Sequence, residues 1–189
     1  MRTLTLAMQV SIDGYVEGNQ GLNWMKKDTP EQWQDMFGFL HNVDLLLLGR
    51  GMWAEYRDYW KEALKPGTDK TKEEVDYARF AEKTSHMVFS QTINEAGWEN
   101  ATIIHGDVVS EIEKIKKRPG KDIHLVGGGR LAATALNAGM VDILTVSIHP
   151  VVLGGGKSFF QQSSIYSEFR LLSTKLYSNE VVILTYLKK

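Results

Sequence analysis

Three consecutive glycines, Gly127 to Gly129, separate a strand pattern from a helix pattern. Residues 122–126 form an apolar β run, and residues 130–136 contain several alanines and leucines and no proline, which favours a helix. A strand that passes through bare backbone into a helix leaves free N–H groups at the positive end of the helix dipole. Such a turn favours a bound anion, most often a phosphate or pyrophosphate. The alternative is a tight turn that requires glycine for steric reasons alone.

The composition predicts one globular domain over residues 1–189. Hydrophobic residues make up 43% of the chain and charged residues 24%, which suits a packed core. A net charge of -1 gives no electrostatic basis for binding nucleic acid or an anionic membrane. The absence of cysteine excludes disulfides, thiolate nucleophiles and cysteine-ligated metals.

The chain also lacks the apolar segments that membrane insertion or secretion requires. The longest apolar run, residues 43–48, is interrupted by Asp44 and is far too short to span a bilayer. The N-terminal segment turns polar at Gln9 and has no signal-peptide core. We therefore expect a cytoplasmic protein.

Strand and helix patterns alternate along most of the chain, and only strands follow. The predicted strands cover residues 3–11, 43–48, 86–89, 101–105, 122–126, 141–149, 169–177 and 181–187. The predicted helices cover residues 30–40, 52–64, 70–83 and 108–117, with a fifth beginning at residue 130. This order predicts an α/β fold with a central mixed, mostly parallel sheet flanked by helices and an antiparallel C-terminal hairpin. Residues 12–21 are expected to be turn and loop, and Trp24 beyond them either forms a lid or site wall or packs in the core.

Three predicted strands end in glycine or small polar residues. These ends are Gly49-Arg50-Gly51, Ser90-Gln91-Thr92 and the glycine triplet. In an open α/β sheet, ligands bind at the carboxyl ends of the strands, so the three ends are expected to converge on one site. Arginine, hydroxyl and bare-backbone donors together suit a dinucleotide.

The spacing of these motifs resembles that of the dihydrofolate reductase-like superfamily. The shared motifs, in order, are Ser11-Ile12-Asp13-Gly14, Leu48-Gly49-Arg50-x-x-Trp53, Phe89-Ser90-Gln91-Thr92, Gly127-Gly128-Gly129, and Val141-Asp142 leading to Pro150-Val151-Val152-Leu153-Gly154. The chain is most similar to the bacterial group that resembles the C-terminal reductase domain of the riboflavin-biosynthesis protein RibD. The resemblance covers nearly the whole chain.

This resemblance implies NADPH as the hydride donor. The residues implied to bind its phosphates, riboses and adenosine are Gly49, Arg50, Gly51, Met52, Ser90, Gln91, Gly127, Gly128, Gly129, Arg130 and Leu131. Ala7, Met8 and Val16 are implied to line the nicotinamide pocket. The resemblance also implies a cis peptide between Gly127 and Gly128, and a homodimer formed through the C-terminal strands or through the aromatic helix at residues 53–60.

Two residues depart from the pattern of the family. Met52 stands where threonine is usual, which removes one hydroxyl donor to phosphate. Gln91 stands where many relatives have arginine, which leaves Arg50 and nearby lysines to favour NADPH over NADH, because glutamine cannot hold a phosphate bidentately.

Three carboxylates are candidates for the proton donor or substrate ligand. Dihydrofolate reductases place a carboxylate on the helix after the tryptophan loop, but the corresponding count from Gly49 reaches Trp33, so folate is not the expected substrate. Glu31 and Asp35 are the nearest acids, and their alternative role is as solvated surface residues. Asp13 either caps its own turn or contacts the substrate.

The expected activity is therefore that of an NADPH-dependent oxidoreductase that transfers hydride to a small, flat heterocyclic or carbonyl substrate. Within the family, the implied reaction is that of a 5-amino-6-(5-phosphoribosylamino)uracil reductase of riboflavin biosynthesis. The alternative is a non-catalytic nucleotide-binding or scaffold protein with the same fold. The five histidines have no metal-like spacing, so no metal is expected. The aromatic set of the helix at residues 53–60 is expected to form core or subunit interface, or else a stacking wall for a flat substrate.

Overall fold

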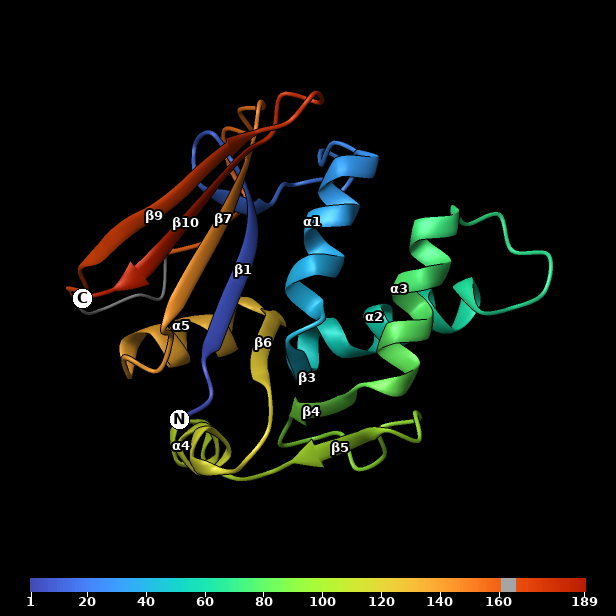
Figure 1. Ribbon diagram of the computed structural model, residues 1–189, viewed down its shortest axis with the longest axis vertical. Coiled ribbons are helices and arrows are strands. Elements are labelled where there is room, and N and C mark those ends of the chain that lie inside the picture. Colours follow the sequence, from blue (N-terminus) through green and yellow to red (C-terminus); the bar gives the residue numbers. More distant parts are fainter. Residues whose placement is uncertain (161–165) are drawn as a thin grey trace.

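An eight-stranded sheet forms the centre of the computed structural model, which describes residues 1–160 and 166–189 (Figure 1). The strand order is β5-β4-β3-β6-β1-β7-β10-β9. All neighbours from β5 to β7 are parallel, and β10 and β9 are antiparallel. The strands are β1 (Leu4–Ser11), β3 (Val43–Gly49), β4 (Ser85–Phe89), β5 (Ala101–Ile104), β6 (Asp122–Gly127), β7 (Ile143–His149), β9 (Phe169–Leu176) and β10 (Val182–Lys188).

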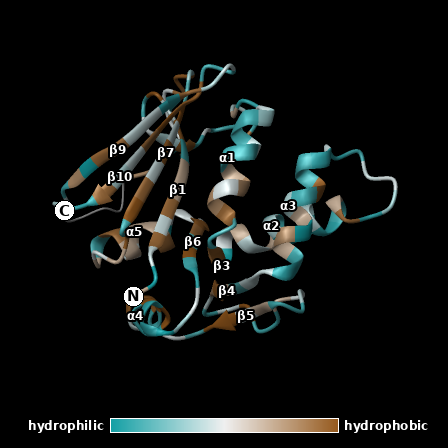
Figure 2. Cartoon of the chain, in the orientation of Figure 1, coloured by the Kyte–Doolittle hydropathy of each residue, from teal (hydrophilic) through white to brown (hydrophobic). Residues whose placement is uncertain are grey.

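Within residues 1–160 and 166–189, five helices cover the two faces of this sheet. They are α1 (Pro30–Leu40), α2 (Arg50–Ala63), α3 (Lys72–Lys83), α4 (Val108–Lys117) and α5 (Gly129–Asn137). Helices α4 and α5 bury Ile112, Ile115 and Leu131 against one face, and α1 to α3 bury Leu40, Trp53 and other side chains against the opposite face, which we call the α1 face. Figure 2 shows hydrophobic residues along the central strands and, in the helices, both hydrophilic and hydrophobic residues.

The predicted alternation of strands and helices and the antiparallel C-terminal hairpin are confirmed. Helix α2 begins at Arg50, two residues before its predicted start, and α3 begins at Lys72, two residues after its predicted start. Two short strands were not predicted: β2 (Tyr15–Glu17) pairs with β8 (Lys157–Ser158). Strands of three and two residues are too short to show periodicity, so the sequence pattern contained no signal for them.

The aromatic residues of α2 form a buried cluster with β4. Trp53 is 1% exposed and Tyr56 6% exposed, and their rings pack around His86. For Trp53 and Tyr56 the structure therefore supports core packing, whereas Tyr59 of the same helix is 39% exposed. Among the described residues, no helix is long and apolar enough to cross a membrane.

Two buried histidines make the stability of this fold depend on pH. Burial lowers the pKa of His86 to about 4 and that of His124 to about 4, and the Nδ1 atom of each has no hydrogen-bond partner within the described residues. Both rings are therefore neutral in the folded chain at pH values where the unfolded chain, with a pKa near 6.5, binds protons.

We expect the contribution of these two histidines to the free energy of unfolding to be complete above pH 6.5 and to decrease as the pH falls toward 4. Each histidine contributes a slope approaching about 1.4 kcal/mol per pH unit, because the unfolded state binds one more proton. Urea unfolding at several pH values measures this slope. His86→Phe should make the slope shallower, while His41→Gln at an exposed position should leave it unchanged. A slope that is the same in wild type and His86→Phe would contradict the assignment.

Candidate cofactor and substrate site

The ends of β3 and β6 lie in contact with each other through Gly49 and Gly128. These neighbouring strands each pass directly into a helix, β3 into α2 and β6 into α5. A Cβ atom on Gly128 would lie 3.4 Å from both Cα and N of Gly49, and Gly128 has a φ of 104°, which other residues rarely adopt. Both helices therefore begin side by side at one edge of the sheet.

The N-termini of α2 and α5 differ from those of the other three helices. Helices α1, α3 and α4 begin with capping side chains, Thr29, Thr71 and Asp107, that accept hydrogen bonds from backbone N–H groups. Helices α2 and α5 have glycine at this position, no capping side chain and no acidic residue in the first turn. Their first N–H groups and the positive ends of their dipoles are thus available to an anion.

Arginine side chains lie at the start of both uncapped helices. Arg50 and Arg130 are exposed and make no ion pair within the described part of the chain. Met52 lies against the turn, because a Cβ atom on Gly127 would approach its Sδ to 3.0 Å. Leu131 is 4% exposed, so its side chain belongs to the core, although its backbone lies in the first turn of α5.

The cis peptide predicted between Gly127 and Gly128 is wrong. The described residues contain no cis peptide bond. Gly127 and Gly128 instead adopt φ values of 155° and 104°, and these positive torsions reverse the chain with trans peptides.

The end of β4 lies next to that of β3, but its side chains face their own loop. The Ser90 hydroxyl oxygen accepts hydrogen bonds from the N–H groups of Thr92 (3.1 Å) and Ile93 (2.9 Å). The Gln91 side-chain amide donates to the carbonyl of His105 at 2.7 Å. The roles predicted for Ser90 and Gln91 beside the adenosine therefore stay predictions.

The C-terminal half of the sheet presents a polar surface on the α1 face. Side chains in register across β1, β7, β10 and β9 share this surface, and most of them are half-buried. We call it the open face; its residues are Ala7, Gln9, Thr145, Ser147, Ser173, Lys175, Ile183 and Thr185, of which Ser147 is buried at 6% exposure. Strands β7, β10 and β9 extend beyond α1 in Figure 1. The alternation of apolar and polar residues from Leu144 to His149 was the sequence signal for this surface.

The nicotinamide-pocket residues implied by the resemblance divide between the two faces. Ala7 lies on the open face, beside Thr145. Met8 points to the opposite face and packs in the core with 9% exposure, and Val16 packs against the same core. Only Ala7 of these three has a side chain on the surface that a ligand would share with Gln9.

Glu31 and Asp35 extend from α1 toward the edge of the open face. Lys175 pairs with the Glu31 carboxylate at 2.9 Å and with Asp35, which also accepts a hydrogen bond from the Tyr177 hydroxyl at 2.6 Å. The hydrogen bond from Lys175 is the main cause that lowers the pKa of Asp35. Asp35 is therefore held as a carboxylate, which suits a role in binding better than one as a proton donor.

Asp13 links two loops. Its carboxylate accepts hydrogen bonds from Ser11 (2.6 Å) and from the backbone N–H groups of Leu153 (3.1 Å) and Gly154 (2.8 Å). These bonds, led by that from Ser11, lower the pKa of Asp13 to about 2. Asp13 thus joins the turn after β1 to the loop after β7.

Asp28 is a carboxylic acid that the sequence analysis did not single out. It lies in the loop immediately before the capping residue of α1, and burial raises its pKa. A raised pKa favours the protonated form, so Asp28 differs from Asp13 and Asp35, whose pKa values are lowered.

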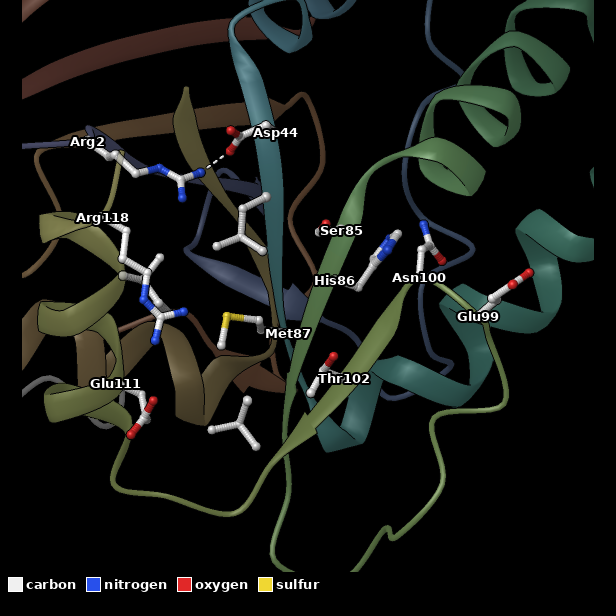
Figure 3. Close-up of a pocket in the computed structure, with 13 residues that line it drawn as sticks. Arg2, Asp44, Ser85, His86, Met87, Glu99, Asn100, Thr102, Glu111 and Arg118 are labelled. Atoms are coloured by element: carbon white, nitrogen blue, oxygen red, sulfur yellow. Dashed lines mark hydrogen bonds and ion pairs between the residues drawn. The ribbon is translucent and has the colours of Figure 1, made fainter. Parts of the chain in front are cut away.

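A depression of about 650 Å³ lies elsewhere, beside α4 and the β4–β5 edge (Figure 3). Its lining includes Met87, Thr102 and Arg118 together with the ion pair between Arg2 and Asp44. None of its lining residues belongs to the glycine turns or to the open face. This depression is therefore separate from the candidate site, which is identified by the uncapped helix N-termini at the ends of β3 and β6.

Comparison with known proteins agrees with this geometry. The family model of the RibD C-terminal domain matches residues 2–183. The chain belongs to the RibD C-terminal domain family. The uncharacterised protein YyaP of Bacillus subtilis (strain 168) is 34% identical to this RibD C-terminal domain protein over 186 residues, covering 98% of this chain and 94% of YyaP.

Three solved structures share its fold. A protein of Shewanella sp. PV-4, provisionally assigned to riboflavin biosynthesis, has a TM-score of 0.78 at 19% identity and covers 99% of both chains. A diaminohydroxyphosphoribosylaminopyrimidine deaminase/5-amino-6-(5-phosphoribosylamino)uracil reductase of Thermotoga maritima has a TM-score of 0.71 at 13% identity, covering 100% of this chain and 57% of that one. Dihydrofolate reductase of Enterococcus faecalis, complexed with NADP(H) and RAB-propyl, has a TM-score of 0.63 at 13% identity, covering 99% of this chain and 96% of that one. The predicted dihydrofolate reductase-like fold is confirmed.

The close approach at Gly128 generates a prediction about stability. Gly128→Ala should lower the free energy of unfolding by about 1–3 kcal/mol, because it forces a side chain into a left-handed conformation. Gly129→Ala is the matched control, since a Cβ atom there meets no atom within 4 Å and its φ is not in that region. Urea unfolding of both variants measures the difference. Equal free energies of unfolding in the two variants would show that position 128 does not require glycine.

Proposed function

We propose that this protein is an NADPH-dependent reductase that transfers hydride to a small, flat heterocyclic or carbonyl substrate. The observation that carries the proposal is the pair of uncapped helix N-termini at the ends of β3 and β6, each with an arginine that makes no ion pair with any described residue. A pyrophosphate is the anion that suits two such N-termini side by side. The family membership and the NADP(H) complex of a structural neighbour support the same cofactor.

The residues at the strand ends fit a dinucleotide phosphate. Backbone N–H groups of residues 49–52 and 127–131 would hold the pyrophosphate, and the absence of a Cβ at Gly128 allows close approach. Arg50 and Arg130 would pair with the remaining phosphate, which favours NADPH over NADH despite glutamine at position 91. When bound, the cofactor supplies the hydride.

The open face fits a flat substrate. The hydroxyl groups of Thr145, Ser147 and Thr185 would face one side of a ring that lies next to Ala7. At its edge, two carboxylates share the single ammonium group of Lys175, so this edge favours N–H donors over a phosphate. We propose that a pyrimidine of the riboflavin-biosynthesis type would direct its amino and ring N–H groups to this edge.

A non-catalytic nucleotide-binding protein is the second candidate. The observation that favours it is the ionised state of Asp13 and Asp35, because neither carboxylate then has a proton to give to a substrate. Loss of NADPH absorbance in the presence of pterins, pyrimidines and small carbonyl compounds separates the two candidates. Binding of NADPH without turnover of any of them would support the second.

We expect Arg50→Leu and Arg130→Leu each to weaken NADPH binding by about 10-fold, because each removes a charge-assisted hydrogen bond to phosphate. Titration of intrinsic tryptophan fluorescence measures the dissociation constant. NADH affinity should change less than NADPH affinity in the variant whose arginine contacts the extra phosphate. Arg79→Leu, at an exposed arginine that pairs with Asp76 on α3, is the control. NADPH affinities that match wild type in both variants would contradict the proposed phosphate site.

We also propose a homodimer formed through β9. This edge strand exposes Leu171 (48%), Leu172 (45%) and Leu176 (70%), and its outer backbone groups have no strand beside them among the described residues. The aromatic helix is the less suitable surface, because Trp53 and Tyr56 are buried.

Light scattering should give twice the chain mass for wild type. The double change Leu172→Lys and Leu176→Lys should give a monomer, because charge on an edge strand opposes pairing. Val152→Lys, at an exposed loop residue, should remain dimeric. A monomeric wild type, or a dimeric double variant, would exclude β9 as the interface.

A further inference from the structure

His149 joins three segments at the end of β7. The residue is 1% exposed. Its Nδ1 lies 3.0 Å from the backbone nitrogen of Lys26, its Nε2 lies 2.6 Å from Oε1 of Gln9, and its ring meets the Trp24 ring edge-on at 5.3 Å. The imidazole of His149 therefore connects the loop that contains Trp24 and Lys26 to Gln9 on the open face.

These contacts fix the tautomer of His149. The backbone N–H of Lys26 can only donate, so Nδ1 must be the acceptor and carry no proton. A neutral imidazole then has its proton on Nε2. Burial, with a smaller effect from the charge of Lys26, lowers the pKa of His149, which is consistent with a neutral ring. Lys26 is the charged neighbour on the loop, and Gln9 and Trp24 complete the contacts of the ring without a charge.

The tautomer of His149 in turn fixes the orientation of the side-chain amide of Gln9. Because Nε2–H of His149 donates, Gln9 must present its oxygen to the ring, and its amino group must point elsewhere. Gln9 is half-buried on the open face, in register with Ser147. Its Nε2 has no hydrogen-bond partner among the described residues and is not a buried atom, so it is accessible to a ligand.

We propose that Gln9 is a ligand-binding residue whose amino group donates a hydrogen bond to a ring-bound carbonyl on the open face, and that His149 is the positioning residue that sets this orientation. The inference rests on the proposed reductase function. The carbonyl has two sources: the carboxamide of the nicotinamide, or a carbonyl of a flat substrate. Without the backbone N–H of Lys26 the ring could adopt either tautomer, so the loop also determines which group of Gln9 faces the ligand.

Isotope-labelled protein tests the geometry and the ligand together. Long-range ¹H–¹⁵N spectra should show the His149 proton on Nε2. The side-chain amide signals of Gln9 are then followed during titration with NADPH, and during titration of the NADP⁺-loaded protein with uracil. Movement with NADPH assigns the carbonyl to the nicotinamide, and movement with uracil alone assigns it to the substrate. Gln9→Glu, which keeps an acceptor for His149 and removes the donor, should weaken that ligand by about 10-fold.

Two variants of His149 separate its effect on the orientation of the Gln9 amide from any effect on the stability of the fold. His149→Gln keeps a donor near Oε1 of Gln9 and should preserve most of the ligand affinity. His149→Asn keeps an acceptor near the N–H of Lys26 but does not reach Gln9, and it should lose affinity as Gln9→Glu does. Binding of 2′-phospho-ADP-ribose, which lacks nicotinamide, should be unchanged in all three variants.

The outcomes distinguish this inference from the proposed function. Wild-type protein that binds neither NADPH nor 2′-phospho-ADP-ribose would show that the reductase proposal fails. Wild-type protein that binds NADPH while the Gln9 signals stay in place with both NADPH and uracil would overturn the role of Gln9 alone. A proton on Nδ1 of His149, or equal affinities in the glutamine and asparagine variants, would overturn the role of His149.

Discussion

The contact between Gly49 and Gly128 is the constraint on which the candidate site depends. It brings the ends of two neighbouring parallel strands together, so that α2 and α5 begin side by side with glycine where the other helices have capping side chains. Any side chain at position 128 would strain the backbone, because φ there is 104°, and its Cβ atom would already be in contact with Gly49 at 3.4 Å. The same feature thus explains a requirement of the fold and the availability of free N–H groups for an anion.

The open face on β1, β7, β10 and β9 is the second part of the candidate site. Parallel pairing places Leu6 of β1 in register with Leu125 near the end of β6, and β1 continues beyond this point to Ser11. The antiparallel β10 and β9 extend the α1 face. A dinucleotide held at the glycine turns would direct its far end along β1, toward Ala7 and Gln9. The carboxylates near this surface differ in state because of their surroundings: donors keep Asp13 and Asp35 ionised, whereas burial favours the protonated form of Asp28.

The sequence predicted what local patterns determine. Strand alternation, the helix over residues 30–40 and the glycine turns are all short-range features, and each was found where it was expected. The features that were missed depend on partners far apart in the chain. Asp13 could not be assigned to loop bracing because its partners, Leu153 and Gly154, are about 140 residues away, and the bond between Gln9 and His149 spans the same separation. The cis peptide was wrong because it was carried over from relatives, while glycine torsions make the same turn with trans bonds.

Glycine-selective ¹⁵N labelling gives the most direct measurement of the central claim, that the two uncapped helix N-termini bind the pyrophosphate of NADPH. The account predicts that adding NADPH shifts the amide signals of Gly51 and Gly129, in the first turns of α2 and α5, while Gly38 in α1 and Gly67 after α2 keep theirs. Saturating NADPH that leaves Gly51 and Gly129 unmoved would contradict it.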